Sequence, residues 1–287
     1  TMFFPNADER LRGINTFVMK VEKNGVSEQF ILNRNQASEW QVILPLTVNH
    51  DAVQVDVLFL MDTTSSMGDE IMQLQNNIWH ISDALASFTD NIDVHYGLLL
   101  YREHDNFEYL TRRHEFTADV SEFQIYLNAV TANSGDNNPD WDETLNVGLD
   151  ESLRLMSWRD ENTIKLIFIV ADAAPHINHP LEPITYDQSM QEALARGIKI
   201  HPIGSSGLEP QGEYIFRQIA QVTMGHFLFL TYDNGVVGTV GDSRPELDVG
   251  DPETLDPIGG YTVDRLADVV LRLIQDEILI FRGIIQP

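Results

Sequence analysis

The sequence predicts an α/β fold in which a doubly wound, mainly parallel sheet carries helices on both faces. Three apolar runs of strand length, residues 55–61, 165–171 and 197–204, lack the alternation of a half-exposed strand. Such runs are typical of strands buried on both faces of a parallel sheet. Helical patterns lie between them, and strand and helix alternate along residues 55–232. Right-handed crossovers would then place the helices on both faces.

The remaining elements of this region follow from periodicity and from stop signals. Residues 94–101 and 226–232 are two further candidate strands. A helix is predicted where apolar residues recur every three or four positions. These residues are Ile71, Leu74, Ile78, Ile81, Leu85 and Phe88. Two more helices, at 186–196 and 213–223, are each followed by a glycine that would end them, Gly197 and Gly225.

Residues 1–52 differ in pattern and predict a small antiparallel β element. Asn24-Gly25 between two of its short runs is a strong hairpin signal. The alternating runs are residues 15–22, 28–33 and 40–46.

The main domain is assigned to residues 53–233, and residues 234–287 form a C-terminal addition. Within the addition, residues 234–260 are rich in Gly, Pro and Asp and predict a long acidic loop. Residues 263–280 predict an amphipathic helix, and residues 280–285 predict a closing strand that pairs with the N-terminal β element.

Composition narrows the class of partner. The formal net charge is -26, from 44 acidic and 18 basic residues. Nucleic acid and anionic membranes are therefore not expected as partners, because their negative charge would be repelled. Cations and basic protein patches are favoured instead. Cysteine is absent, which excludes disulfides and thiolate metal sites. No apolar run approaches the roughly 18 residues of a membrane-spanning helix, so membrane insertion is not expected.

Three polar loops should meet at the carboxyl edge of the sheet, where ligands bind in doubly wound folds. The first directly follows a buried strand and reads Asp62-Thr63-Thr64-Ser65-Ser66. The second begins at Asp172, after the strand at 165–171. The third, residues 134–140, precedes the helix before that strand and contains Asp136, Asn137 and Asp140.

These loops offer carboxylates and hydroxyls without cysteine or paired histidine, which selects Mg²⁺, Ca²⁺ or Mn²⁺. Thr64 and Ser66 are two residues apart, so both hydroxyls can point the same way in an extended loop. Two hydroxyls and one or two carboxylates as direct ligands would leave a coordination position of the metal free for a partner's carboxylate. Taken alone, the first loop could also be a simple helix cap, but Asp172 and the third loop at the same edge favour the metal site.

The first loop and Asp172 resemble the metal-ion-dependent adhesion site of the von Willebrand factor A family, microbial and bacterial members above all. Asp62, Thr64 and Ser66 fill its Asp-x-Ser-x-Ser element, and Asp172 fills its last element. The resemblance covers residues 55–232 and implies a Rossmann-like fold. The third loop departs from the Thr-bearing pattern and looks more like Gly-Gly-x-Asp-x-Pro-Glu.

In that comparison Asp140 stands where Glu is usual and Asn137 where Asp is usual. Asp140 is one methylene shorter than Glu, so it would reach the metal through water unless Asp136 replaces it. The resemblance thus implies one Mg²⁺ site, or Ca²⁺ or Mn²⁺ in its place. Its ligands would be Asp62, Thr64, Ser66, Asp172 and Asp140 or Asp136, with Ser65, Asn137 and His176 at the rim or behind the ligands.

The resemblance implies a non-enzymatic, adhesion-type binding module, extracellular or at the cell surface, whose protein partner supplies an exposed Asp or Glu to the metal. A first alternative is a cytoplasmic partner of an AAA⁺ ATPase that uses the same site. A second is a metal-assisted hydrolase, for which His176 is the only evident base beside the site.

Overall fold

The computed structural model divides the chain into two compact units, residues 1–50 and 51–287, and each is described by itself. The described residues are 13–23, 26–33, 53–88, 91–104, 108–132, 143–159, 162–205, 207–232, 245–248 and 266–284.

The first unit contains a two-stranded antiparallel sheet, as the alternating runs predict. β1 (Thr16–Lys23) pairs with β2 (Val26–Asn33) along their whole length. Asn24-Gly25 and the predicted third run, 40–46, lie outside the described residues.

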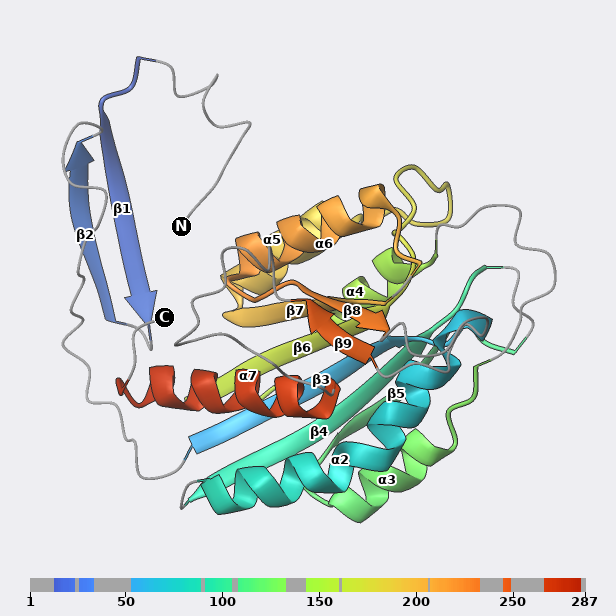
Figure 1. Ribbon diagram of the computed structural model, residues 1–287. Helices are drawn as coiled ribbons and strands as arrows, with labels where there is room; N and C mark the ends of the chain where they lie inside the picture. The colour runs from blue at the N-terminus through green and yellow to red at the C-terminus, as the bar shows by residue number, and fades with distance from the viewer. Residues whose placement is uncertain are drawn as a thin grey trace. The chain divides into compact units, whose positions relative to one another are not determined.

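The second unit is built on one seven-stranded sheet with the order β5-β4-β3-β6-β7-β8-β9 (Figure 1). Five neighbouring strands, from β4 to β8, are parallel, and the two outer strands are antiparallel to their neighbours. The strands are β3 (Val53–Asp62), β4 (Ile92–Tyr101), β5 (Thr111–Thr117), β6 (Thr163–Ala171), β7 (Ile198–Gly204), β8 (Leu228–Tyr232) and β9 (Pro245–Asp248).

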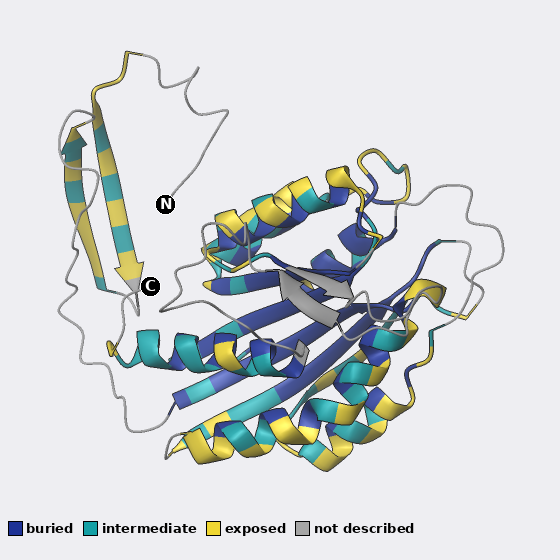
Figure 2. Ribbon diagram, viewed as in Figure 1, coloured by how far each residue is buried: buried dark blue, intermediate teal, exposed yellow. Residues whose placement is uncertain are grey.

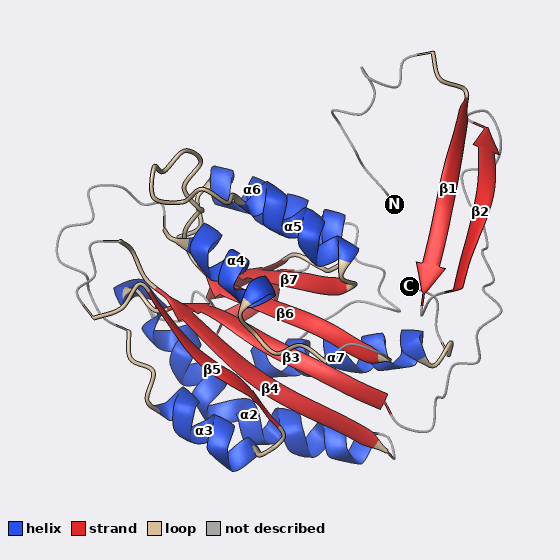
Figure 3. Cartoon of the chain, turned by 180° about the vertical axis from the view of Figure 1, so that it is seen from behind, coloured by secondary structure: helices blue, strands red, loops and turns tan. Residues whose placement is uncertain are grey.

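Helices cover both faces of this sheet, which confirms the predicted fold class (Figures 1 and 3). One face carries α2 (Gly68–Phe88), α3 (Val120–Asn128) and α7 (Leu266–Phe281). The other carries α4 (Leu145–Arg154), α5 (Tyr186–Ala195) and α6 (Pro210–Thr223). Within the described part of the chain, no helix is both long and apolar enough to span a membrane.

The central strand β3 shows why the strands read as continuous apolar runs. Val57, Phe59 and Met61 belong to the core beneath α2, α3 and α7. The intervening Leu58 and Leu60 belong to the core beneath α4 and α6. All five are fully buried, and Figure 2 shows the same burial along the central strands. A strand packed on both faces has no reason to alternate.

The C-terminal addition differs from the prediction in two places. The predicted closing strand is wrong over residues 280–284, because α7 continues to Phe281 and ends in a hydrogen-bonded turn. Gly283 takes φ 69° there, and the N–H of Ile284 donates to the carbonyl of Leu279 at 2.9 Å, which is a common glycine stop. The predicted loop 234–260 contains β9, which pairs with β8.

The two glycines predicted as helix stops play different roles. Gly197 has φ 65°, as expected of a residue that ends a helix. At the end of α6 the left-handed residue is Met224, with φ 61°. Gly225 instead allows a close approach, since a Cβ there would lie 1.9 Å from the carbonyl oxygen of Ile200 in β7.

The strand order fixes where a binding site can form. β3 connects to β4 on one side, whereas β6, its neighbour on the other side, leads outward to β7. The connections therefore diverge between the carboxyl ends of β3 and β6. In doubly wound sheets such a switch point opens a crevice that binds ligands.

Candidate functional site

Asp62 is the last residue of β3 and stands at this switch point. Its Oδ1 accepts hydrogen bonds from the backbone N–H and the hydroxyl of Thr64, both at 2.8 Å. The chain then turns through η1 (Ser65–Met67) into α2. The hydroxyl oxygens of Thr64 and Ser66 lie 3.4 Å apart, and both Ser65 and Ser66 are exposed. The loop thus groups the side chains of Asp62, Thr64 and Ser66.

Asp172 directly follows β6 and faces the same loop. The hydroxyl of Ser66 donates a hydrogen bond to its carboxylate. Burial, followed by repulsion from Asp172, raises the pKa of Asp62 to about 7. Burial likewise raises the pKa of Asp172. The structure therefore brings two acidic residues from adjacent parallel strands into one electrostatic cluster.

The second carboxylate oxygen of Asp62 is the most informative atom of this cluster. Asp62 is fully buried, and its Oδ2 has no hydrogen-bond partner among the described residues. A buried carboxylate oxygen without a partner is costly, because water no longer solvates it. A proton or a bound cation would remove that cost, and the oxygen-only surroundings fit a hard divalent ion.

Glu143 is a further carboxylate at this edge that the sequence analysis missed. It is buried, and its backbone N–H donates to the carbonyl of Ala174 at 2.8 Å, beside Asp172. The pKa of buried Tyr101 is raised well above its ordinary value by burial and then by the charges of Asp62, Glu143 and Asp172. The charges of all three carboxylates therefore act on Tyr101.

A usable signal existed for this residue. Glu143 and Thr144 immediately precede the helix whose buried Leu145, Leu149 and Leu153 recur every four residues. The predicted third-loop residues Asp136, Asn137 and Asp140 lie outside the described residues. Glu70, in the first turn of α2, adds a weaker repulsion that also raises the pKa of Asp62.

A buried arginine holds the Asp62 loop from behind. Arg102 follows β4, and its Nε donates to the hydroxyl of Thr63 at 3.1 Å. Its Nη2 donates to the carbonyl of Thr131 at 2.9 Å, and Nη1 pairs with Glu108 at 2.5 Å. The Tyr109 hydroxyl lies 2.8 Å from that of Thr63. Arg102 therefore fixes the residue next to Asp62.

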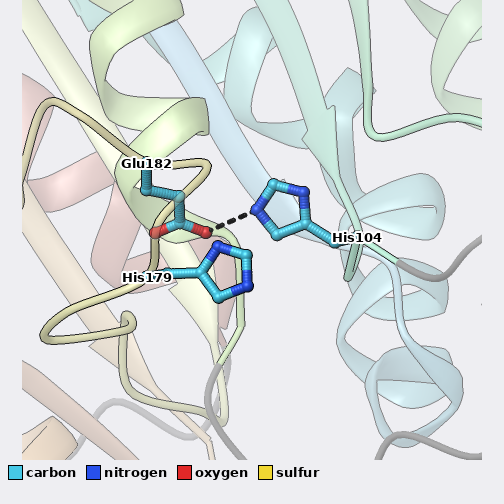
Figure 4. A group of neighbouring side chains, drawn as sticks. All are labelled: His104, His179 and Glu182. Carbon is cyan, nitrogen blue, oxygen red and sulfur yellow. Dashed lines mark hydrogen bonds and ion pairs between the residues drawn. The ribbon is translucent and has the colours of Figure 1, made fainter.

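His176, predicted at the rim of the site or behind its ligands, is buried, and both of its ring nitrogens approach carboxylates. Its Nδ1 lies 2.9 Å from Glu182 Oε1, and its Nε2 lies 3.5 Å from Glu103 Oε2. Two further histidines, His104 and His179, which the sequence analysis did not single out, gather beside the same glutamate (Figure 4).

Glu182 is the centre of this second group. Burial raises the pKa of Glu182, but hydrogen bonds from His176 and Asn146 outweigh it and leave the pKa below its ordinary value. Glu182 is therefore an ionised carboxylate surrounded by imidazoles. Sequence patterns give no signal for this group, because His104 and Glu182 are far apart in the chain and meet only through the sheet.

Comparison with known proteins agrees with this fold. The family profile described as von Willebrand factor A domain matches residues 56–231. A curated protein named Alpha-protein kinase vwkA, from Dictyostelium discoideum, is 28% identical over 122 residues. That alignment covers 42% of this chain but only 19% of the kinase.

Proposed function

Because the chain belongs to the von Willebrand factor A family, we propose that it binds a protein partner through one divalent cation held at the carboxyl ends of β3 and β6. Proteins of this family generally mediate protein interactions. The ligands would be Asp62, Thr64, Ser66 and Asp172, with Glu143, which follows the third loop, as a further carboxylate. We expect Mg²⁺, with Ca²⁺ or Mn²⁺ as substitutes.

One observation carries this proposal. Asp62 is buried with Oδ1 held by Thr64, while Oδ2 has no partner within the described ranges of the chain. Asp172 lies close enough to raise the pKa of Asp62. A helix cap would leave its carboxylate exposed to solvent or fully paired. A cation explains why the fold tolerates a buried, half-satisfied carboxylate beside a second one.

The cation would supply a coordination position for a carboxylate of the partner. Thr64 is half-buried and Ser66 is exposed, so the site opens toward solvent on the side of these hydroxyls. An exposed Asp or Glu of the partner is the hard oxygen ligand that suits such a position. The negative charge of this chain, -26, would also favour a partner with a basic surface around that acid.

We propose a binding role and not a catalytic one. The kinase activity named in the relative belongs to a protein of which the alignment covers 19%. His176, the base that a hydrolase would need, has both ring nitrogens directed at Glu182 and Glu103. A histidine so placed is poorly suited to take a proton from a water molecule at the Asp62 loop.

The test is Mg²⁺ and Mn²⁺ binding by calorimetry on the wild type and on Asp62→Ala. We expect the variant to lose binding while its circular dichroism stays unchanged. Asp83→Ala is the matched control, since Asp83 is an exposed carboxylate on α2. It should bind as the wild type does, because exposed carboxylates on one helix face do not form a coordination sphere.

Equal metal affinity in Asp62→Ala and Asp83→Ala would refute the site. The partner function needs a second experiment, in which captured proteins are compared with Mg²⁺ and with EDTA. We expect capture that requires Mg²⁺ and that Asp62→Ala abolishes. Capture that persists in EDTA and in the variant would show that partners bind elsewhere on the chain.

A further inference from the structure

Two histidines and a buried glutamate form a compact group on the same side of the sheet. His104 comes three residues after β4, whereas His179 and Glu182 lie in the connection between β6 and α5. The rings of His104 and His179 stack at 4.4 Å between centroids, and both lie against Glu182 (Figure 4). Each residue offers one ligand atom, and these three atoms lie within 4.8 Å of one another.

We propose that His104, His179 and Glu182 bind a second divalent metal ion, with Zn²⁺ as the cation of best fit. Two imidazoles and one carboxylate are a ligand set that selects zinc and neighbouring transition metals over Mg²⁺ and Ca²⁺. Three protein ligands leave a fourth position for water. The Asp62 site, built of oxygen atoms alone, selects the opposite class of ion, so both sites can be filled together.

The carboxylate of this group is already held in place. Glu182 Oε2 accepts a hydrogen bond from Asn146 Nδ2 at 2.8 Å. Asn146 is fixed in turn, because its Oδ1 accepts from the backbone N–H of Tyr186 at 2.7 Å. The other oxygen, Oε1, faces both His104 Nε2 and His176 Nδ1, each at 2.9 Å. One oxygen is thus anchored, and the other is directed toward the histidines.

His176 and Glu103 form the support behind this set. His176 contacts Glu182 Oε1 with one ring nitrogen and approaches Glu103 with the other, at 3.5 Å. In known metal sites, ligating carboxylates are held by hydrogen bonds from neighbouring side chains, as His176 would hold Glu182. A metal would replace the hydrogen bond between His104 and Glu182, and His176 would keep its own bond to that glutamate.

The group is open to an ion from solvent. The side chain of His104 is 16% exposed and His179 is half-buried, whereas the side chain of Glu182 is fully buried. An ion can therefore reach the imidazoles first and meet Glu182 beneath them. The connection that carries His179 and Glu182 begins at Asp172, so a metal here would restrain the loop that also serves the Asp62 site.

The experiment uses the full chain without a histidine tag and the Asp62→Ala background, so that only the second site is measured. Zn²⁺ is titrated in competition with a chromophoric chelator. We expect one Zn²⁺ per chain and at least a tenfold loss of affinity in His179→Ala. His80→Ala is the matched control, since His80 is 59% exposed on α2, and it should bind as its parent does.

Co²⁺ gives an independent readout, because its visible absorption bands report histidine nitrogen and low coordination number. We expect these bands in the parent and in His80→Ala, and their loss in His179→Ala and in His104→Gln. Unchanged circular dichroism shows that each variant is folded. If His179→Ala does not fold, His104→Gln takes its place as the test variant. No Zn²⁺ binding in the parent, or equal affinity in His179→Ala and His80→Ala, would overturn the proposal. Neither result bears on Mg²⁺ binding at Asp62.

Discussion

Asp172 lies close enough to Asp62 for its charge to raise the pKa of the Asp62 carboxyl. Asp62 ends β3 and Asp172 directly follows the neighbouring parallel strand β6, in whose register Met61 stands opposite Val170. One carboxylate accepts from Thr64 and the other from Ser66. The four side chains therefore converge from two strands on one place, which is the geometry that a divalent cation would neutralise.

Mg²⁺ affinity should rise with pH. The metal-free pKa of Asp62 is about 7, and Mg²⁺ binds only the ionised carboxylate, so binding at pH 6 must release a proton. We expect the apparent affinity to increase about fivefold between pH 6 and pH 7 and about tenfold by pH 8, above which it levels off. Calorimetry at each pH, in two buffers of different ionisation enthalpy, measures both the affinity and the released proton.

The same shift predicts the stability of the metal-free chain. The pKa of Asp62 in the folded chain lies above its value in the unfolded chain. The protonated carboxyl therefore stabilises the folded chain at low pH, and this stabilisation is lost as pH rises through about 7. In EDTA, Asp62→Asn should therefore gain stability relative to the wild type between pH 5.5 and pH 8. This account would be contradicted if the stabilities of wild type and Asp62→Asn changed in parallel with pH and the Mg²⁺ affinity did not change with pH.

Glu143→Gln should weaken Mg²⁺ binding by about 10–100-fold, the range seen when a carboxylate supporting a metal site is removed. Its charge acts on Tyr101 together with those of Asp62 and Asp172, so it belongs to the same cluster. Calorimetry compares it with Glu209→Gln, an exposed glutamate ahead of α6. Asp140→Ala should cost less affinity than Asp172→Ala. If Glu143→Gln binds Mg²⁺ as Glu209→Gln does, Glu143 is not part of the metal site.

Apolar periodicity predicted the sheet because burial decides the residue type at each core position. Val57 and Leu58 face different cores and both must be apolar, so β3 reads as an unbroken run. The edge strand β5 was missed because its sequence, Thr111 to Thr117, is polar and half-exposed and carries no such constraint.

The site was predictable only where motif and strand end coincide. Asp62 and Asp172 directly follow buried strands, so sequence position alone places them at the carboxyl edge. Glu143 depends on a loop whose register no periodic pattern fixes. His104 and Glu182 come together because β4 and β6 flank β3, which is a property of strand order and not of local sequence.

His201→Asn should change the response of stability to acid. His201 is buried against Phe168, with a ring distance of 5.1 Å, and its Nδ1 accepts from the backbone N–H of His226 at 3.1 Å. Burial, then the charges of His226 and Lys199, lower its pKa to about 3. The pKa of His201 in the folded chain lies below the unfolded value of about 6.5. The stabilisation from the neutral, buried ring is therefore fully present above pH 6.5 and is lost as pH falls toward 3.

For one proton, this loss amounts to about 1.4 kcal/mol per pH unit. Urea unfolding in EDTA from pH 7 to pH 4.5 should show this extra slope in the wild type relative to His201→Asn, which keeps an acceptor near Nδ1. His80→Asn, at an exposed position on α2, should keep the wild-type slope. Identical slopes for wild type and His201→Asn would mean that His201 is protonated in the folded chain.

Gly225→Ala should destabilise the domain by about 4 kcal/mol or more, which only severe core defects reach. A Cβ at this position would lie 1.9 Å from the carbonyl oxygen and 2.7 Å from the carbonyl carbon of Ile200, and the backbone of β7 is fixed in the sheet. Gly68→Ala is the control, because its Cβ would meet only the Cβ of Ala132 at 3.8 Å, and φ is −57°. Thermal and urea unfolding should leave Gly68→Ala within about 1 kcal/mol of the wild type. Equal unfolding midpoints for the two variants would show that the end of α6 can move away from β7.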